Sequence, residues 1–271
     1  MDARLQLRIQ RYGWDLASGH YEPLWSRQLH AAQAAMLELA AVEPGERVLD
    51  VASGTGLATF AAAGLVGPAG AVVGVDLSGR MVDAARSLAD ERGLDHVSFE
   101  RMDAQDLDLP DAAFDVALCA LGLMYVPEPE AAIREMRRVL RPGGRAAMAV
   151  WGERRACGWS AVFEIVDAEV ESDVCPMFFR LGQQGALERA CSDAGFTSIE
   201  QRRISTTLEY EDFDEACEAA FVGGPVAMAW SRFDQPMRER ARLRYAEAID
   251  EWRDGTGYRI PGEFVIVTGR A

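Results

Sequence analysis

Residues 47–57 read Arg-Val-Leu-Asp-Val-Ala-Ser-Gly-Thr-Gly-Leu, and this stretch decides the fold of the chain. The apolar residues at its start predict a buried parallel strand, and the small residues that follow predict a tight turn into a helix. Gly54 and Gly56 lack the Cβ atoms that would keep a ligand away from the backbone, and the next helix begins with unpaired N–H groups. The stretch therefore predicts a nucleotide-type binding loop.

Two features of this loop argue against a dinucleotide ligand. The dinucleotide motif Gly-x-Gly-x-x-Gly needs a third glycine, and Thr59 stands at that position. Asp50 ends the strand, where its charge would repel a pyrophosphate but could accept hydrogen bonds from an ammonium group. The loop therefore favours a zwitterionic or cationic ligand, and a nicotinamide-dependent oxidoreductase is a disfavoured alternative.

Further apolar runs predict the rest of a parallel sheet. They lie at residues 71–78, 97–104, 114–120 and 145–150, with a helix at residues 128–140 before the last of them. Asp76 and Asp103 end the first two of these runs. A carboxylate at the end of the second strand suits binding to ribose hydroxyls.

In order and spacing these blocks resemble those of class I S-adenosylmethionine-dependent methyltransferases, most of all the ubiquinone/menaquinone-biosynthesis type. The motifs that carry the resemblance are Leu49-Asp-Val-x-x-Gly-Thr-Gly56, Val75-Asp-Leu-Ser78, Asp103-Ala-x-x-Leu-x-Leu-Pro110 and Leu140-Arg-Pro-Gly-Gly144. The resemblance implies S-adenosyl-L-methionine as cofactor. It also implies an α/β Rossmann-like fold with a mostly parallel, seven-stranded sheet, helices on both faces, and a last strand antiparallel between the fifth and sixth.

The resemblance implies roles for single residues as well. Asp50 and the turn at residues 52–56 would hold the methionine end of the cofactor, Asp76 the ribose, Leu77 and Met81 the adenine faces, and Asp103 the adenine amino group. The implied cofactor-binding residues are Tyr21, Asp50, Ala52, Ser53, Gly54, Gly56, Asp76, Leu77, Met81, Asp103, Ala104 and Cys119, the last through a backbone contact to the ligand ammonium. Structural roles for Asp76, Asp103 and Cys119 remain alternatives. Where this chain has Ala52 the family often has glycine, so the turn must accommodate a Cβ atom.

Composition limits the partners of the protein. The chain has 271 residues, and its 28 Lys and Arg against 43 Asp and Glu give a net charge of −15. An acidic surface repels phosphates, so we expect neither nucleic acids nor anionic membranes as partners. No apolar run is long enough for a membrane span, and charges occupy the first ten residues, where a signal peptide needs an apolar core. We expect a cytoplasmic protein.

The sequence predicts three segments within one unit: an N-terminal helical lid at residues 1–45, a cofactor-binding core at 46–151, and a C-terminal part at 152–271. Residues 2–42 are predicted to be helical. The aromatic-rich stretch from Trp14 to Trp25 indicates a lid over the ligand, with Gly13 and Gly19 as hinges, or alternatively a hydrophobic staple. His20 is the candidate general base, needed only if the acceptor loses a proton.

The C-terminal part is predicted to hold helices at residues 158–170, 184–194, 211–221 and 235–252, an apolar stretch at 174–179, and strands at 197–208 and 263–268. The third and fourth helices form an insertion between the sixth and seventh core strands. This part should supply much of the substrate wall. The candidate wall residues are Tyr125, Trp151, Trp159, Phe178, Phe179 and Met228.

The sequence thus predicts methyl transfer to an O, N or C atom of a small organic metabolite. Five scattered cysteines without a Cys-x-x-Cys motif predict reduced thiols and no metal site. Cys157 and Cys175 raise the alternative of a thiophilic substrate such as arsenite. A second alternative is a protein that binds S-adenosylmethionine without turnover, because the motifs report cofactor binding only.

Overall fold

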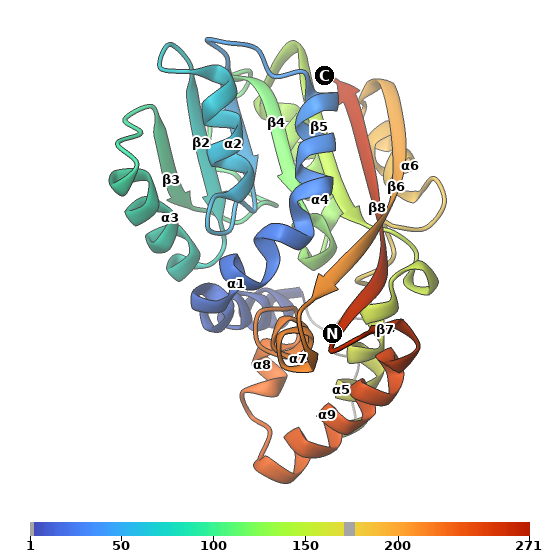
Figure 1. The fold of residues 1–271 in the computed structure, drawn as a ribbon. Coiled ribbons are helices and arrows are strands. Elements are labelled where there is room, and N and C mark those ends of the chain that lie inside the picture. The colour runs from blue at the N-terminus through green and yellow to red at the C-terminus, as the bar shows by residue number, and fades with distance from the viewer. Residues whose placement is uncertain (1–2, 171–176) are drawn as a thin grey trace.

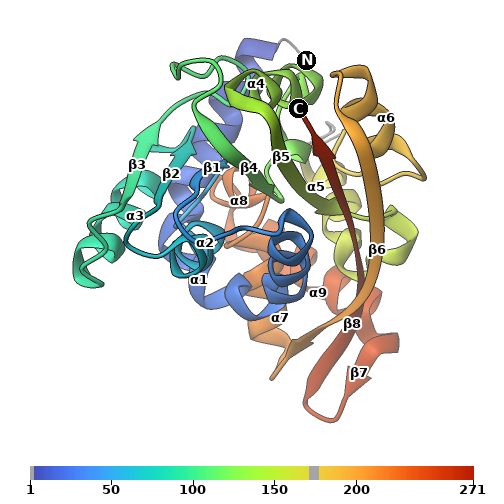
Figure 2. The same cartoon turned by 90° about the horizontal axis from the view of Figure 1, so that it is seen from above.

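A mixed β-sheet runs through the protein, shown here as a computed structural model that describes residues 3–170 and 177–271 (Figure 1). Its strands lie in the order β3-β2-β1-β4-β5-β8-β6, with the two-residue β7 paired to β8, and they fan out from β3 to β6 when seen from above (Figure 2). The strands are β1 (Arg47–Val51), β2 (Ala71–Asp76), β3 (Val97–Arg101), β4 (Phe114–Ala120), β5 (Leu140–Trp151), β6 (Thr197–Tyr210), β7 (Arg253–Asp254) and β8 (Gly257–Arg270).

The strand directions confirm the predicted fold class. β1 to β5 are parallel, and β8 runs antiparallel between β5 and β6. In register, Asp50 at the end of β1 lies opposite Gly74 in β2 and Leu118 in β4. The loops that follow these three strands therefore meet at one edge of the sheet, which is where parallel α/β sheets bind ligands.

Helices cover both faces of the sheet. They are α1 (Ala3–Ala40), α2 (Leu57–Val66), α3 (Gly79–Glu91), α4 (Pro129–Val139), α5 (Ala161–Val170), α6 (Ala186–Asp193), α7 (Phe213–Phe221), α8 (Ala227–Trp230) and α9 (Gln235–Ile249). The second half of α1 and α2 share one apolar cluster with the sheet, while α4, α5 and α6 share another with its opposite face. Burial of these two apolar layers supplies the main stabilisation of the fold.

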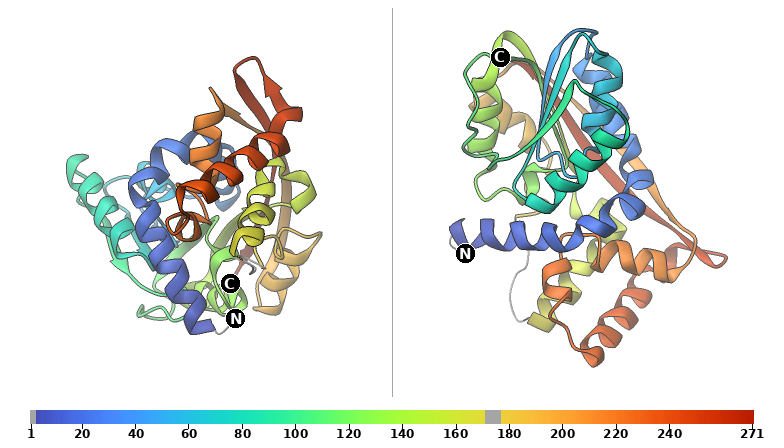
Figure 3. Two further views of the ribbon diagram at one scale, coloured as in Figure 1. Left: turned by 90° about the horizontal axis from the view of Figure 1, so that it is seen from below. Right: turned by 90° about the vertical axis from the view of Figure 1, so that its left-hand side faces the viewer.

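α1 confirms the helix predicted at the N-terminus, and it is bent. Pro23 lies inside it and has no N–H to donate to the preceding turn. The second half of α1 packs on the sheet, whereas the first half runs in another direction across the end of the strands (Figure 3). Between residues 4 and 20, all of which the structure describes, only Gln10 and Ala17 are buried.

Some element boundaries differ from the predicted ones. β5 begins at Leu140 instead of residue 145, because Leu140 pairs with Phe114 and a bulge absorbs the following Pro-Gly-Gly segment. β8 begins at Gly257 instead of residue 263, since its first residues pair with the end of β6. The predicted helical insertion between the last two long strands is present as α7, α8 and α9. The apolar stretch at 174–179 lies partly outside the described residues, and Cys175 falls there.

Candidate functional site

A cavity lies where the loops after β1, β2, β3 and β4 meet the first half of α1. Eight of the predicted cofactor residues line it: Tyr21, Ala52, Gly54, Asp76, Leu77, Met81, Asp103 and Ala104. The other four, Asp50, Ser53, Gly56 and Cys119, are buried and are not among the lining residues. At the end of β4 the wall is instead formed by Ala120, Leu121 and Gly122. One continuous surface thus collects residues that the sequence separates widely.

The turn after β1 depends on left-handed backbone geometry. Gly56 caps α2 with φ 96°, and a Cβ atom there would come within 2.7 Å of the Phe60 ring. Ala52 also has a positive φ, 57°, which strains a residue with a side chain by about 1 kcal/mol. A Cβ atom on Gly122 would lie 2.4 Å from the Cβ of Ala52. Because Gly122, in the loop after β4, has no side chain, there is room for the methyl group of Ala52.

Asp76 connects two of the loops. Its carboxylate accepts one hydrogen bond from Gly54 N at 2.9 Å and one from Ser78 N at 2.8 Å. Burial raises the pKa of this carboxyl group, although the two N–H donors oppose the shift, and the nearby Asp15 carboxylate raises it further. The N-cap of α3 is Ser78, whose hydroxyl accepts a hydrogen bond from Met81 N.

Asp50 lies behind the turn. Its Oδ2 accepts a 2.6 Å hydrogen bond from the Thr59 hydroxyl, while its Oδ1 has no hydrogen-bond partner among the described residues. Burial raises the pKa of Asp50 to about 7, and the Asp76 charge contributes in the same direction. The hydroxyls of Ser53 and Thr55 are also buried without a partner in the described part of the chain. These unpaired atoms fit the polar methionine end of S-adenosylmethionine, whose donors and acceptors could satisfy them.

Aromatic rings form the other half of the cavity. They are Trp14, Tyr21 and Trp25 of α1, Tyr125, Trp151 at the end of β5, and Trp159. Trp151 and Trp159 have ring centroids 5.0 Å apart, and Trp25 lies about 6 Å from each, at 6.2 and 6.0 Å. The indole N–H groups of Trp25 and Trp159 are buried without a partner among the described residues. No Lys, Arg or His occurs among the described residues that line the cavity.

The predicted wall residues divide into two groups. Tyr125, Trp151 and Trp159 line the cavity. Phe178 and Phe179 stand behind them, with Phe178 centred 5.3 Å from the Tyr125 ring. Met228 does not line the cavity and lies beside Gly13 of α1, whose added Cβ would be 3.6 Å from that of Met228.

His20 and Cys157 lie away from the cavity. His20 is exposed on α1, because it precedes the cavity-lining Tyr21 by one residue and therefore points about 100° away from it around the helix. Its position gives no support to the predicted role as a base. Cys157 is buried, its thiol lies 3.9 Å from the Glu263 carbonyl oxygen, and burial raises its pKa to about 12. Within residues 3–170 and 177–271, no cluster of side chains could hold a metal ion.

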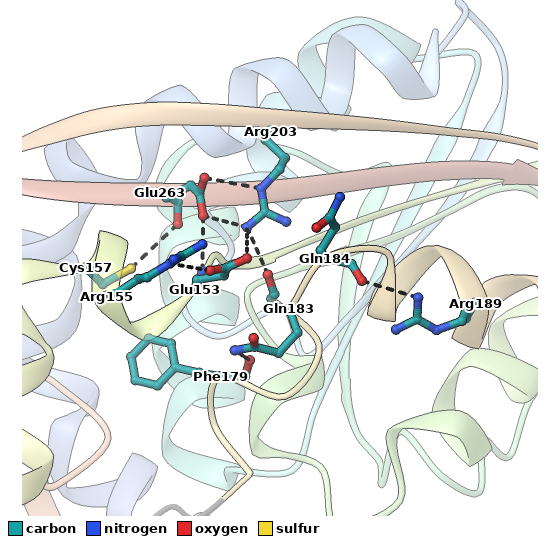
Figure 4. A network of polar contacts seen from close by, with 10 residues as sticks. Glu153, Arg155, Cys157, Phe179, Gln183, Gln184, Arg189, Arg203 and Glu263 are labelled. Atoms are coloured by element: carbon teal, nitrogen blue, oxygen red, sulfur yellow. Dashed lines mark hydrogen bonds and ion pairs between the residues drawn. The ribbon is translucent and has the colours of Figure 1, made fainter.

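A network of polar contacts joins Arg203, Glu263 and Glu153 (Figure 4). Arg203 of β6 donates to the Glu263 carboxylate of β8 at 2.6 Å and to the Gly182 carbonyl at 3.0 Å. Gly182 packs so closely that a Cβ atom would lie 2.2 Å from the Trp151 carbonyl oxygen. This network therefore ties the segment around Gly182 to the end of β5 and to strands β6 and β8.

Sequence reasoning missed the polar contact that holds α1 down. Asp15 Oδ1 accepts a 2.6 Å hydrogen bond from the buried Ser78 hydroxyl and a longer one, 3.3 Å, from Arg80 N. Ser78 in turn follows Asp76 by two residues, so the first half of α1 contacts the loop that presents Asp76. Nothing in the local sequence pairs residues 63 positions apart.

Comparisons with known proteins agree with this geometry. Residues 42–175 match the family described as Methyltransferase domain. The ubiquinone/menaquinone biosynthesis C-methyltransferase of Ectopseudomonas mendocina is 42% identical over 132 residues, which is 48% of this chain and 49% of that protein. The matched stretch thus spans about half the length of this curated relative. The corresponding enzyme of Teredinibacter turnerae is 32% identical over 216 residues, 79% of this chain and 82% of the relative.

The chain belongs to the S-adenosylmethionine-dependent methyltransferases. A putative methyltransferase from Bacillus halodurans shares the fold, with a TM-score of 0.63 and 21% identity over 89% of this chain and 98% of that one. Membership brings S-adenosylmethionine as the expected cofactor, and the glycine turn, the acid at the end of β2 and the unpaired polar atoms behind the turn all suit it. The glycine turn and the acid both lie at the edge of the sheet where the parallel strands have their carboxyl ends.

Proposed function

We propose that this protein transfers a methyl group from S-adenosylmethionine to a small organic acceptor. The observation that carries the proposal is a single cavity with two chemically different halves. One half holds the glycine turn, Asp76 and Asp103, and the other holds six aromatic rings without a basic residue among its described lining residues. The first half suits the cofactor, and the second suits an apolar or aromatic acceptor that lies beside it.

The cofactor-side residues would bind and orient. Asp76 already accepts two backbone N–H groups, and the remaining lone pairs of its carboxylate would accept hydrogen bonds from the two ribose hydroxyls. Asp50 Oδ1 would receive the ammonium group, Leu77 and Met81 would pack on the adenine, and Asp103 would accept from its amino group. When bound, the cofactor supplies a methyl group that is activated by a positively charged sulfur.

The aromatic residues would exclude water and position the acceptor in line with the bond that breaks. The indole N–H groups of Trp25 and Trp159 can donate to an oxygen atom on the acceptor, which would satisfy two buried donors that lack protein partners. No histidine, lysine or cysteine is among the described lining residues, and the two carboxylates there, Asp76 and Asp103, lie in the half assigned to the cofactor. The site therefore suits an electron-rich acceptor atom, including the carbon acceptors named for the relatives.

The placement of Cys157 bears on the thiophilic alternative. Its thiol is buried at the junction with Glu263 and Arg203 and is not part of the cavity lining (Figure 4). Burial also keeps it protonated, because its pKa is raised to about 12. The proposal therefore assigns no role to arsenite. The four described cysteines are free, and the cytoplasm is the compartment we propose for reduced thiols.

The first half of α1 is proposed as the lid over this cavity. Leu7, Gln10 and Trp14 of this half line the cavity, while few of the other side chains in the same half are buried. Cofactor and acceptor must pass a helix that covers their site, and closure of the helix would exclude water during transfer.

The proposal is tested by incubating the purified protein with S-adenosylmethionine and a panel of phenols, quinols, amines, keto acids and arsenite. Formation of S-adenosylhomocysteine together with a product heavier by one methyl group, lost in Asp76→Ala, would support it. Turnover with arsenite alone would replace the organic acceptor in the proposal. Tight cofactor binding without turnover on any acceptor class would favour the alternative of a binding protein.

A further inference from the structure

The outer face of the lid helix is apolar. Leu5, Tyr12 and Leu16 are 41%, 49% and 50% exposed, and they recur after seven and four residues along α1. At 100° per residue they fall within one narrow stripe of the helix surface. The opposite side of the same turns, through Leu7 and Trp14, lines the cavity. A helix that already covers a cavity with one apolar side thus presents a second apolar side to solvent.

A basic stripe runs beside the apolar one. Residues 4–16 contain three basic residues, Arg4, Arg8 and Arg11, and one acid, Asp15, whose carboxylate accepts hydrogen bonds from the Ser78 hydroxyl and Arg80 N. Arg8 and Arg11 lie about 60° apart around the helix, beside the apolar stripe, and Asp15 falls between them on the turn that contacts Ser78. The guanidinium of Arg11 lies over the Tyr12 ring, 4.5 Å from its centre. Three arginines against one aspartate give residues 4–16 a net charge of +2, opposite in sign to the net charge of −15 on the whole chain.

We propose that this face of α1, defined by Leu5, Tyr12 and Leu16 with Arg8 and Arg11, docks on the surface of an anionic lipid bilayer. The helix lies parallel to the surface, with the three apolar side chains at the level of the acyl chains and the arginines among the phosphates. No helix among the described residues is long and apolar enough to cross a membrane, so the contact is with one leaflet.

Other occupants fit this face less well. A nucleic acid would pair with the arginines but offers no apolar layer to receive Leu5 and Leu16. A second copy of the chain, packed face to face about a twofold axis, would bring Arg8 and Arg11 of both copies together. An anionic bilayer has both parts of the complementary surface, because its phosphates lie directly above its acyl chains.

The acidic remainder of the protein does not prevent this contact. Charges separated by more than about 8 Å are largely screened at physiological salt, so the docking face responds mainly to its own charges. Each arginine close to an anionic surface contributes about 1 kcal/mol. Net charge alone predicts repulsion from anionic membranes because it treats the charge as evenly distributed, and α1 departs from that distribution.

Vesicle co-sedimentation of the full chain tests the proposal without cofactor or acceptor, so its failure is separate from any failure of methyl transfer. The probes are vesicles of phosphatidylcholine alone and vesicles in which phosphatidylglycerol replaces a third of the lipid. We expect binding to the anionic vesicles that weakens with added salt. The double variants Leu5→Gln/Leu16→Gln and Arg8→Gln/Arg11→Gln should each bind about tenfold more weakly or worse, with unchanged melting temperatures.

Leu243→Gln is the matched control, because Leu243 is a 66% exposed leucine on α9, outside the docking face. It should bind the anionic vesicles as the unmodified chain does. Equal loss of binding in this control, equal binding to both kinds of vesicle, or no binding to either would overturn the proposal. So would a dimer in sedimentation experiments that disappears in Leu5→Gln/Leu16→Gln, since it would assign the face to a second copy.

Discussion

Replacement of Asp76 tests the cofactor side of the site most directly. In Asp76→Ala the ribose hydroxyls lose a charged acceptor, and hydrogen bonds to charged groups contribute about 1.5–3 kcal/mol each. At 1.4 kcal/mol per factor of ten, the dissociation constant for S-adenosylhomocysteine should rise about 10- to 100-fold. Calorimetric titration of the purified variant measures this change.

The same substitution has a second effect that must be separated from the first. Asp76 accepts the N–H groups of Gly54 and Ser78, and Ser78 is fully buried. Their loss should lower the stability of the ligand-free protein by about 1–3 kcal/mol. Asp76→Asn keeps the volume and one acceptor, so it should bind better than Asp76→Ala and melt at a higher temperature.

Asp106→Ala provides the control, because Asp106 is an exposed acid close to Asp103 that does not line the cavity. Its affinity for S-adenosylhomocysteine should equal that of the unmodified chain. The reasoning about the end of β2 would be refuted by unchanged affinity in Asp76→Ala when the variant is shown to be folded.

Three further predictions concern other parts of the site. Since burial raises the pKa of Asp50 from 3.8 to about 7, the folded chain keeps a proton between these pH values that the unfolded chain has lost, and stability from this group falls as pH rises through that window. Thermal unfolding of Asp50→Asn and of the unmodified chain should be compared at pH 5 and pH 8. The difference in melting temperature between the two proteins should change with pH, and a constant difference would contradict the raised pKa. Removal of residues 1–20 keeps Trp25, and it should leave the sheet folded but reduce turnover more than tenfold, roughly the loss expected if water enters the site. In the full chain, amide exchange of residues 14–25 should slow on adding S-adenosylhomocysteine. Full protection of these amides without ligand would instead indicate a permanent staple. Trp159→Phe keeps the ring but removes the indole donor, so it should raise KM for an oxygen-bearing acceptor about tenfold without changing cofactor affinity, and an unchanged KM would exclude that contact.

Local patterns in the sequence were sufficient for the part of the site that binds the cofactor. A buried strand, a small-residue turn and a helix follow one another within residues 47–66, and acids end the next two predicted strands. These signals depend on neighbours along the chain, which periodicity reports directly. Eight predicted residues consequently line the observed cavity, and the antiparallel last strand between the fifth and sixth followed from the resemblance that these motifs support.

Contacts between distant segments were beyond the reach of the sequence. The tilt and rotation of α1 decide that Trp14 and Tyr21 line the cavity while His20 does not, and the bend at Pro23 sets both. An aromatic-rich stretch predicts that rings gather near a ligand, but one residue of rotation moves a side chain by about 100° around a helix. The sequence carries no measure of that rotation.

The chain's own motifs thus determined the family, the cofactor-binding turn and the acid at the end of β2. Only the tertiary structure decided that Asp15 reaches Ser78, that Thr59 holds Asp50, and that Gly122 leaves room for the strained turn at Ala52. The physical reason is the range of each interaction. Strand and helix signals arise from side chains a few positions apart, whereas these contacts form only after the sheet has brought its loops to one edge.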